Sequence, residues 1–333
     1  MNVPPTDFIP VSVSDLHLLV MRLLCVPGVS EDHARVIADL MIDTDLRGVF
    51  SHGTQPLGGY LQGYQTGTIN PVPDLKIVKE TPVSVLVDGD GGLGHVATHM
   101  AVARAIEKTR TTGFCMAVSR FHAHFGSAGK YTRVIVKEGL IGFCVSGLCA
   151  RIPEDSNTNA WAHYPLDNCP MSFGFPAKEG YPVISDICSS VMDEWDVESE
   201  RFQSIFEQMP SAVFRSLGLR AVTNFLSAGL GGMMLPGFRD GERKWQNAYY
   251  GAFCWILDPQ VFVEAEAFEE EVDRTTRVIG ELQPLPGYQR AELPGGPEWE
   301  REIAFRRDGI PLGEGHRRSL ETAADKLGVA VPW

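Results

Sequence analysis

The sequence has little positive charge and no long apolar run, and these absences exclude several classes of protein. Its 333 residues hold 29 lysines and arginines against 42 aspartates and glutamates, a formal net charge of -13 at pH 7. We therefore expect no nucleic-acid partner and no anionic membrane surface, because phosphate binding needs clustered cations. No apolar run is long enough to span a bilayer, and the first residues lack a basic segment followed by an apolar one, so we expect a cytoplasmic protein.

Several reactive motifs are also missing. The seven cysteines form no C-x-x-C pair, and four of them lie in apolar runs typical of buried, reduced thiols: Cys25, Cys115, Cys144 and Cys254. Neither a G-x-S-x-G elbow nor a G-x-x-x-x-G-K-[ST] loop occurs. The sequence therefore indicates neither a serine hydrolase of the elbow type nor a P-loop protein.

What the sequence does contain is an alternation of helical and strand-like segments. Apolar positions at helical spacing, bounded by Ser, Gly or Pro, predict helices near residues 12–26, 30–45, 57–67, 94–110, 126–137, 210–230, 264–282, 298–307 and 317–327. Short apolar runs predict strands near 75–78, 83–87, 114–118, 141–145, 183–187 and 249–257. Residues 147–181 are expected to be irregular. This alternation predicts an α/β fold in which helices cover a sheet.

A first candidate site is the turn at residues 45–53, which follows the second predicted helix. It holds Asp45, Arg47, Ser51 and His52 between flexible glycines. Ionisable groups on a glycine-bounded turn are placed to meet a ligand. The alternative is an ordinary helix-exit loop whose Arg and His are solvated.

A second candidate is the segment Arg120-Phe-His-Ala-His-Phe-Gly126. His124 follows a buried strand and precedes a helix, the position where α/β proteins place ligands, and histidine suits proton transfer near neutral pH. A histidine at the core edge, bonded to backbone, is the alternative. His95 and His99 lie four residues apart on one helix, but no third ligand is near in sequence, so we expect no metal site.

The turn at residues 89–94 fits the pattern G-x-G-x-x-G between a strand and a helix, the context of a dinucleotide fingerprint. The acidic residue expected after the next strand is missing, because that strand leads to Ser119 and Arg120. A structural glycine turn is therefore the competing interpretation.

Taken together, these stretches resemble the malate/L-lactate dehydrogenase family of the non-Rossmann type. That family includes ureidoglycolate and sulfolactate dehydrogenases and piperideine-carboxylate reductases. The matching segments follow the family's order and cover nearly the whole chain: residues 45–53, 87–94, 119–126 with Tyr131, 138–142, 186–190, 217–219 with Gly229 and Gly232, and 309–312.

The resemblance implies a sulfolactate-dehydrogenase-like α/β fold: a mixed sheet with flanking helices, not a Rossmann fold. It implies a helical substrate and dimer unit (residues 1–74 with 290–333) and an α/β domain (75–289) that carries the cofactor-type site. It also implies a homodimer that uses NAD or NADP and acts on a small carboxylate substrate, a 2-hydroxy acid or a cyclic 2-imino acid. The glycine turn at 89–94 would then be structural, because this family does not hold its nicotinamide cofactor there.

Roles for individual residues follow from the same resemblance. His124 would be the acid/base at the substrate carbon, while His52 and Arg47 would hold the substrate, with Arg47 as the clamp for its carboxylate. Further substrate contacts are expected from Ser51, Tyr60 and His122. Cofactor contacts are expected from Ser146, Asp186, Ile187, Cys188, Arg215 and Gly295.

The sequence departs from the family pattern mostly in the cofactor half. The segment 167–170 replaces a G-T-N-P motif, Arg215-Ser216 replaces Lys-Gly, the acidic stretch 193–200 lies in a shortened connection, and 294–296 replaces Pro-Gly-Glu. In the substrate half, Phe50 precedes Ser51 where a polar residue is common. Two alternatives to a nicotinamide enzyme follow. One is a repurposed family member that has lost the cofactor and catalyses proton transfer, as a lyase, isomerase or cyclase; the other is a binding or scaffold protein.

Overall fold

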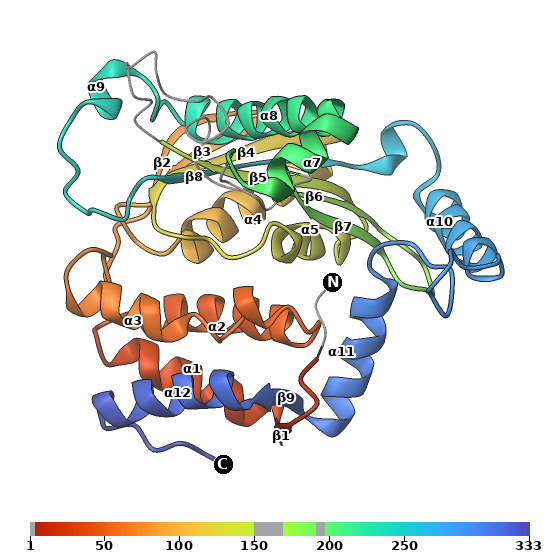
Figure 1. Ribbon diagram of the computed structural model, residues 1–333. Coiled ribbons are helices and arrows are strands. Elements are labelled where there is room, and N and C mark those ends of the chain that lie inside the picture. Colours follow the sequence, from red (N-terminus) through yellow and green to blue (C-terminus); the bar gives the residue numbers. More distant parts are fainter. Residues whose placement is uncertain (1–3, 150–168, 191–196) are drawn as a thin grey trace.

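The computed structural model describes residues 4–149, 169–190 and 197–333. Its centre is a seven-stranded sheet with the strand order β2-β3-β4-β8-β5-β6-β7 (Figure 1). The strands are β2 (Lys76–Thr81), β3 (Ser84–Asp88), β4 (Phe114–His122), β5 (Ile141–Leu148), β6 (Pro170–Phe175), β7 (Val183–Cys188) and β8 (Tyr250–Leu257).

Only one pair of neighbouring strands in this sheet, β3 and β4, is parallel; the other five pairs are antiparallel. A doubly wound Rossmann sheet would be parallel throughout its nucleotide-binding half. The prediction of a mixed, non-Rossmann sheet is therefore confirmed.

Helices cover both faces of the sheet (Figure 1). One face packs against α4 (Gly94–Thr112) and α5 (Gly129–Val136), and the other carries α7 (Glu200–Gln208) and α8 (Pro210–Asn224), which continues as the π-helix η2 (Phe225–Gly229). Because it is covered from both sides, β5 is buried at all eight positions, as expected for a continuous apolar strand.

A helical layer lies beneath α4 and α5 (Figure 1). It consists of α1 (Val13–Cys25), α2 (Glu31–Asp45), α3 (Leu57–Gln65) and α12 (Glu314–Leu327), with a small antiparallel pair of β1 (Phe8–Val11) and β9 (Ile310–Gly313). Ser12 and Ser30 cap α1 and α2 by accepting backbone N–H groups from Asp15 and His33. Leu16 and Leu320 share one core, so the two ends of the chain fold together.

Two helices complete the chain beside these layers: α10 (Ala265–Gly280) and α11 (Gly296–Asp308). Two short helices, α9 (Pro236–Arg239) and η3 (Pro259–Val261), flank β8. In the described ranges no helix has the length and hydropathy needed to cross a bilayer.

The sequence analysis missed β1, β6, β9 and α7. β1 and β9 are four residues long and each contains a proline, so neither has a readable alternation. β6 also begins at a proline, Pro170, within a stretch predicted to be irregular. Residues 150–168 of that stretch and 191–196 of the acidic connection lie outside the described residues.

The glycine turn at 89–94 is structural. Gly91 has φ of +73°, and a Cβ there would lie 2.2 Å from the ring of Trp245. The N–H of Gly94 donates to the carbonyl oxygens of Ala123 and His124. The turn therefore fixes the chain that leaves β4 and leads to His124.

Candidate active site

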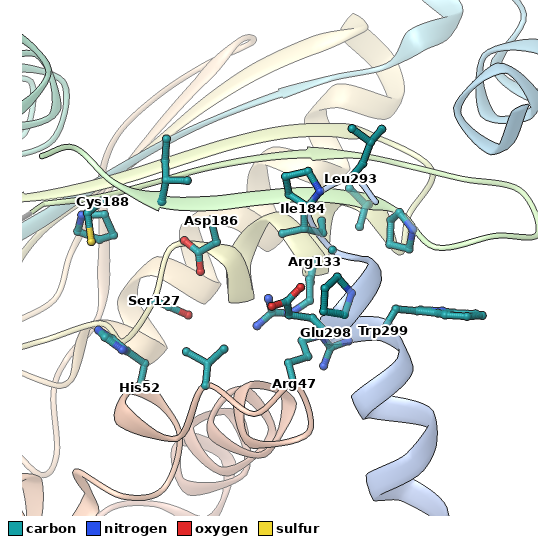
Figure 2. Close-up of a pocket in the computed structure, with 18 of the residues that line it drawn as sticks. Arg47, His52, Ser127, Arg133, Ile184, Asp186, Cys188, Leu293, Glu298 and Trp299 are labelled. Carbon is teal, nitrogen blue, oxygen red and sulfur yellow. The ribbon is translucent and has the colours of Figure 1, made fainter. Parts of the chain in front are cut away.

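A cavity of about 1100 Å³ lies where the turn after α2, the loop before α5, the ends of β5 and β7 and the chain around α11 meet (Figure 2). Figure 2 shows Asp186 and Cys188 on one wall, His52 and Arg47 opposite them, and Glu298 with Trp299 at one end. This volume slightly exceeds the range for small-molecule sites, about 300–1,000 Å³, so the cavity is large enough for a small ligand.

His124 lines this cavity directly after β4. Its Nδ1 lies 2.6 Å from the hydroxyl oxygen of Tyr60, and its ring centroid is 5.9 Å from that of His52. Burial, reinforced by His52 and Lys130, lowers the pKa of His124 to about 3. The ring is therefore neutral near pH 7, and its Nε2 has no hydrogen-bond partner among the described residues.

The turn at 45–53 is built around a buried carboxylate. Asp45 accepts hydrogen bonds from the N–H and the hydroxyl group of Thr54, at 3.0 and 2.6 Å, and burial raises the pKa of Asp45 to about 7. A Cβ on Gly53 would lie 1.8 Å from Asp45 Oδ1. Asp45 therefore shapes the turn, while Ser51 and His52, whose Oγ and Nδ1 are 2.9 Å apart, line the cavity.

Lys130 was missed by the sequence analysis. It is fully buried, with Nζ 3.2 Å from the carbonyl oxygen of His52 and 3.1 Å from His95 Nε2, and burial lowers its pKa to about 7. The same Lys130 contributes, after burial, to lowering the pKa of His52. His95 is thus a partner of Lys130, and the described residues contain no cluster of three metal-ligating side chains.

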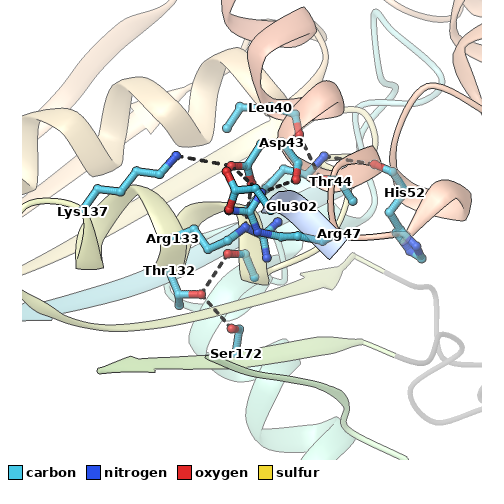
Figure 3. A network of polar contacts seen from close by, with 12 residues as sticks. Leu40, Asp43, Thr44, Arg47, His52, Thr132, Arg133, Lys137, Ser172 and Glu302 are labelled. Atoms are coloured by element: carbon cyan, nitrogen blue, oxygen red, sulfur yellow. Dashed lines mark hydrogen bonds and ion pairs between the residues drawn. The ribbon is translucent and has the colours of Figure 1, made fainter. Parts of the chain in front are cut away.

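Arg47 lines the cavity, but its guanidinium is bound by the protein (Figure 3). Nη1 lies 2.9 Å from Asp43 Oδ1 and Nη2 lies 2.5 Å from Glu302 Oε2, and the side chain is 7% exposed. Since both terminal nitrogens are engaged, this geometry does not favour the predicted role of Arg47 as the carboxylate clamp.

Three further predicted residues do not line the cavity. His122 is fully buried, with Nε2 3.0 Å from Ser119 Oγ and Nδ1 2.8 Å from the carbonyl oxygen of Ala123, so this geometry does not favour its predicted contact with substrate. Arg215 is exposed on α8, on the opposite face of the sheet from His124's cavity, which does not favour its predicted cofactor contact. Tyr60 does not line the cavity either, but its hydroxyl group is hydrogen-bonded to Nδ1 of His124, which does.

The remaining predicted cofactor residues lie together. They line the same cavity as His124: Ser146, Asp186, Ile187, Cys188 and Gly295. The side chain of Asp186 is exposed to the cavity, and the surrounding protein atoms raise the pKa of its carboxyl to about 6 although nearby Arg133 opposes this.

Apolar side chains are open to the cavity beside these groups. Ile187, Tyr288 and Leu285 are 48%, 57% and 75% exposed and all line it. Such surface suits the flat faces of a nicotinamide and its nucleoside. The segments 150–168 and 191–196, which include two of the departures from the family pattern, lie outside the described residues.

Comparison with known proteins agrees with this architecture. A family model described as malate/L-lactate dehydrogenase matches residues 11–204 and 203–321. Malate dehydrogenase of Pyrococcus abyssi is 32% identical over 97% of this chain and 96% of its own length, and L-sulfolactate dehydrogenase of Methanocaldococcus jannaschii is 25% identical over 94% and 96%. The solved structure of malate dehydrogenase from Pyrococcus horikoshii OT3 has the same fold, with a TM-score of 0.82 and 24% identity over 99% of both chains. The chain therefore belongs to the malate/L-lactate dehydrogenase family.

Proposed function

We propose that this protein is an NAD(P)-dependent oxidoreductase that acts on a small 2-hydroxy acid or cyclic 2-imino acid, with His124 as its acid/base. The observation that carries the proposal is a neutral histidine, hydrogen-bonded from behind by Tyr60, on the wall of a cavity that also holds the expected cofactor residues. The dehydrogenases among the relatives support the reaction class.

His124 supplies the proton chemistry. In the oxidation direction, Nε2 of His124 accepts the proton of the substrate hydroxyl group as hydride leaves the carbon that bears this group. In the reduction direction, the protonated ring returns that proton. The nicotinamide, when bound, accepts or supplies the hydride. Nε2 can accept the substrate proton because the neutral ring carries its own proton on Nδ1, which donates to the hydroxyl oxygen of Tyr60 and so fixes the ring. Tyr60 keeps its own proton, because burial raises the pKa of its hydroxyl group well above the usual value.

Ser51 and His52 would contact the substrate from the opposite wall. The cofactor would be held along β5, β7 and the start of α11 by Ser146, Asp186, Ile187, Cys188 and Gly295.

One observation favours a second candidate function, proton-transfer chemistry without nicotinamide. Arginine side chains favour the binding of a dinucleotide pyrophosphate, but two of the three cavity arginines of the described residues, Arg47 and Arg290, have both terminal nitrogens on protein carboxylates. A homodimer and a cytoplasmic location are also part of the proposal. Three exposed apolar residues, Phe214 on α8 and Phe225 and Leu230 at the two ends of η2, are suitable for a subunit interface, which light scattering would test.

Cofactor binding tests the proposal first. We expect NADH or NADPH to gain fluorescence on binding the pure protein, and a panel of 2-oxo acids and cyclic imines to oxidise it. Changing His124→Ala should lower kcat roughly 10²- to 10⁴-fold with cofactor affinity retained. The matched control is His17→Ala, which removes an exposed histidine paired with Asp39 on the outer helices. No binding signal from either cofactor at millimolar concentration would refute the proposal and favour the second candidate.

A further inference from the structure

Two residues that line the cavity carry a buried polar atom without a hydrogen-bond partner among the described residues. Among the described residues, buried side-chain nitrogen or oxygen atoms without a hydrogen-bond partner occur in few places, and only two of these residues line the cavity: Ser127 through Oγ and Arg133 through Nη2. Each residue is 6% exposed. Buried polar groups are nearly always hydrogen-bonded, so a pair left open on a cavity wall indicates a site for a ligand.

The two residues lie close together in the chain, on either side of the start of α5. Ser127 lies three residues after His124, and Arg133 lies one helical turn beyond Gly129 on α5. Side chains on a helix lean toward its N-terminus, and the Arg133 side chain follows this rule: a Cβ built on Gly129 would lie 3.0 Å from Arg133 Nη1. The guanidinium therefore lies over Gly129, two residues after Ser127, and Figure 2 shows Ser127 and Arg133 at the cavity on either side of Asp186.

The absence of a side chain at residue 129 keeps this space open. The same Cβ would also lie 2.5 Å from Asp186 Oδ2, so any larger residue would fill the gap between Asp186 and Arg133. Asp186 is already stabilised there by the backbone N–H of Gly129. Arg133, in contrast to Asp186, keeps one terminal nitrogen, Nη2, for which the described residues supply no acceptor.

The local charge balance favours an anion at Arg133. Asp43 is shared by three cations: it binds Arg133 Nε at 2.6 Å, Arg47 Nη1 at 2.9 Å and Lys137 Nζ at 3.3 Å (Figure 3). Glu302 adds one further carboxylate on Arg47. Glu302 also binds Arg306, and Asp186 lies near Arg133, so this wall holds four cations against three carboxylates and keeps one positive charge in excess. Glu298 also lines the cavity, but it lies 3.6 Å from its own cation, Arg301.

We propose that Arg133 and Ser127 bind the carboxylate of the substrate, and that Arg47 positions Arg133 through their shared partner Asp43. Arg133 Nη2 donates to one carboxylate oxygen and Ser127 Oγ donates to the other. This places the carbon next to the carboxylate within the neighbourhood of His124, three residues away in the chain. The assignment rests on the proposed function for the identity of the reacting carbon, but the carboxylate subsite itself does not depend on nicotinamide.

Binding of an unreactive 2-oxo-acid analogue tests the subsite separately from catalysis. The probe is oxamate, and its uncharged counterpart oxamide reports what the carboxylate contributes. By calorimetry, we expect oxamate to bind the unaltered protein more tightly than oxamide. Arg133→Met should weaken oxamate roughly ten- to hundredfold and bring the two ligands close together, as expected for the loss of a charge-assisted hydrogen bond.

Further variants keep the test decisive if Arg133→Met folds poorly. Ser127→Ala removes one hydroxyl group and should weaken oxamate about three- to tenfold. Arg133→Lys keeps a charge beside Asp43 and should recover part of the affinity. The matched control is Arg104→Met, which removes an arginine paired with Glu80 outside the cavity and should leave oxamate binding unchanged.

Three outcomes would overturn the subsite: no oxamate binding by the unaltered protein, equal preference for oxamide, or unchanged affinity in both Arg133→Met and Ser127→Ala. If oxamate binds as expected while NADH and NADPH do not, the proposed dehydrogenase function fails and the carboxylate subsite stands. If the cofactor binds but the Arg133 variants bind oxamate as tightly as the unaltered protein does, the carboxylate subsite fails and the proposed dehydrogenase function stands.

Discussion

The variant Asp43→Asn removes the central carboxylate of the network that lines the cavity wall. Asp43 is 13% exposed in its side chain, and it binds two nearly buried guanidinium groups, those of Arg47 and Arg133, which are 7% and 8% exposed. Lys137, its third partner, is 59% exposed and can turn to solvent. The substitution keeps the size of the side chain but leaves two buried cations with one counter-charge fewer.

The loss of unfolding free energy expected for Asp43→Asn depends on those two buried guanidinium groups. Removing one partner of a buried ion pair costs about 3–5 kcal/mol, whereas an exposed pair contributes about 0–1 kcal/mol. Glu302 still binds Arg47, and the amide oxygen of Asn can still accept one hydrogen bond, so we expect a loss of about 3 kcal/mol in the free energy of unfolding. Urea unfolding followed by circular dichroism at pH 7 measures this.

The control is Asp39→Asn, one turn earlier on α2, where the carboxylate is 62% exposed and pairs with His17. Its effect should stay within about 0.5 kcal/mol. A loss of less than about 1 kcal/mol for Asp43→Asn, or an equal loss for the control, would refute the view that this network is a buried and electrostatically coupled unit.

Acidification should abolish the difference in the free energy of unfolding between the unaltered protein and Asp43→Asn. Burial alone would raise the pKa of Asp43, but Arg133, Arg47 and Lys137 together outweigh it and hold that pKa well below its usual range. A carboxyl whose folded pKa is depressed stabilises the fold above its unfolded pKa of about 3.9 and loses that contribution as pH falls toward the folded value. The gap between the unaltered protein and Asp43→Asn should therefore narrow below about pH 4. A difference in unfolding free energy that stays constant on acidification would contradict the view that Asp43 is a charged partner of these cations.

Three further predictions concern the acid/base and its turn. Tyr60→Phe should lower kcat about tenfold with little change in melting temperature, because it removes only the hydrogen bond to His124 Nδ1; an unchanged kcat would exclude a positioning role. Since the pKa of His124 is about 3, kcat/KM for oxidation should be insensitive to this group from pH 8 to pH 5, whereas kcat/KM for reduction should rise about tenfold per pH unit on acidification; a reduction profile that levels off near pH 6.5 would contradict this pKa. Gly53→Ala should cost about 1–3 kcal/mol in thermal or urea unfolding, because its Cβ would overlap the carboxylate of Asp45, while Gly59→Ala on the open face of α3 should be neutral or stabilising.

The fold was largely predictable because its helices and central strands carry strong local signals. Ser12 and Ser30 mark the helix starts that the structure confirms, and the strand at β8 is an uninterrupted apolar run. Sheet order was not predictable, because β8 inserts between β4 and β5 more than a hundred residues after either. Local patterns do not encode such pairings.

The site was predicted in part, and its errors have a common cause. His124 and Tyr60 are 64 residues apart, and only the family resemblance suggested that they belong to one site. Lys130 and Arg133 were passed over because charged residues on a predicted helix are normally solvated. Here every residue of α5 except Val134 is buried, since the helical layer covers the side that faces away from the sheet.

The prediction for Arg47 shows why residue type alone does not assign a clamp. Asp43 lies four residues before Arg47, a spacing that favours an ion pair on one helix face and was visible in the sequence. Glu302 is 255 residues away and was not. Together they engage both terminal nitrogens of Arg47, whereas Arg133, held by Asp43 only through Nε, keeps Nη2 available.

The network of Asp43, Arg47, Arg133 and Glu302 connects three helices that form the cavity. Asp43 comes from α2, Arg47 from the turn that follows it, Arg133 from α5 and Glu302 from α11. One set of ion pairs therefore joins the helical layer, the helix beneath the sheet and the C-terminal segment (Figure 3). A charge placed by three packed elements has little freedom to relax, which is the condition under which an arginine binds a carboxylate with a defined geometry. The buried cations thus have different tasks: Arg47 fixes the frame, and Arg133, fixed by that frame, faces the ligand.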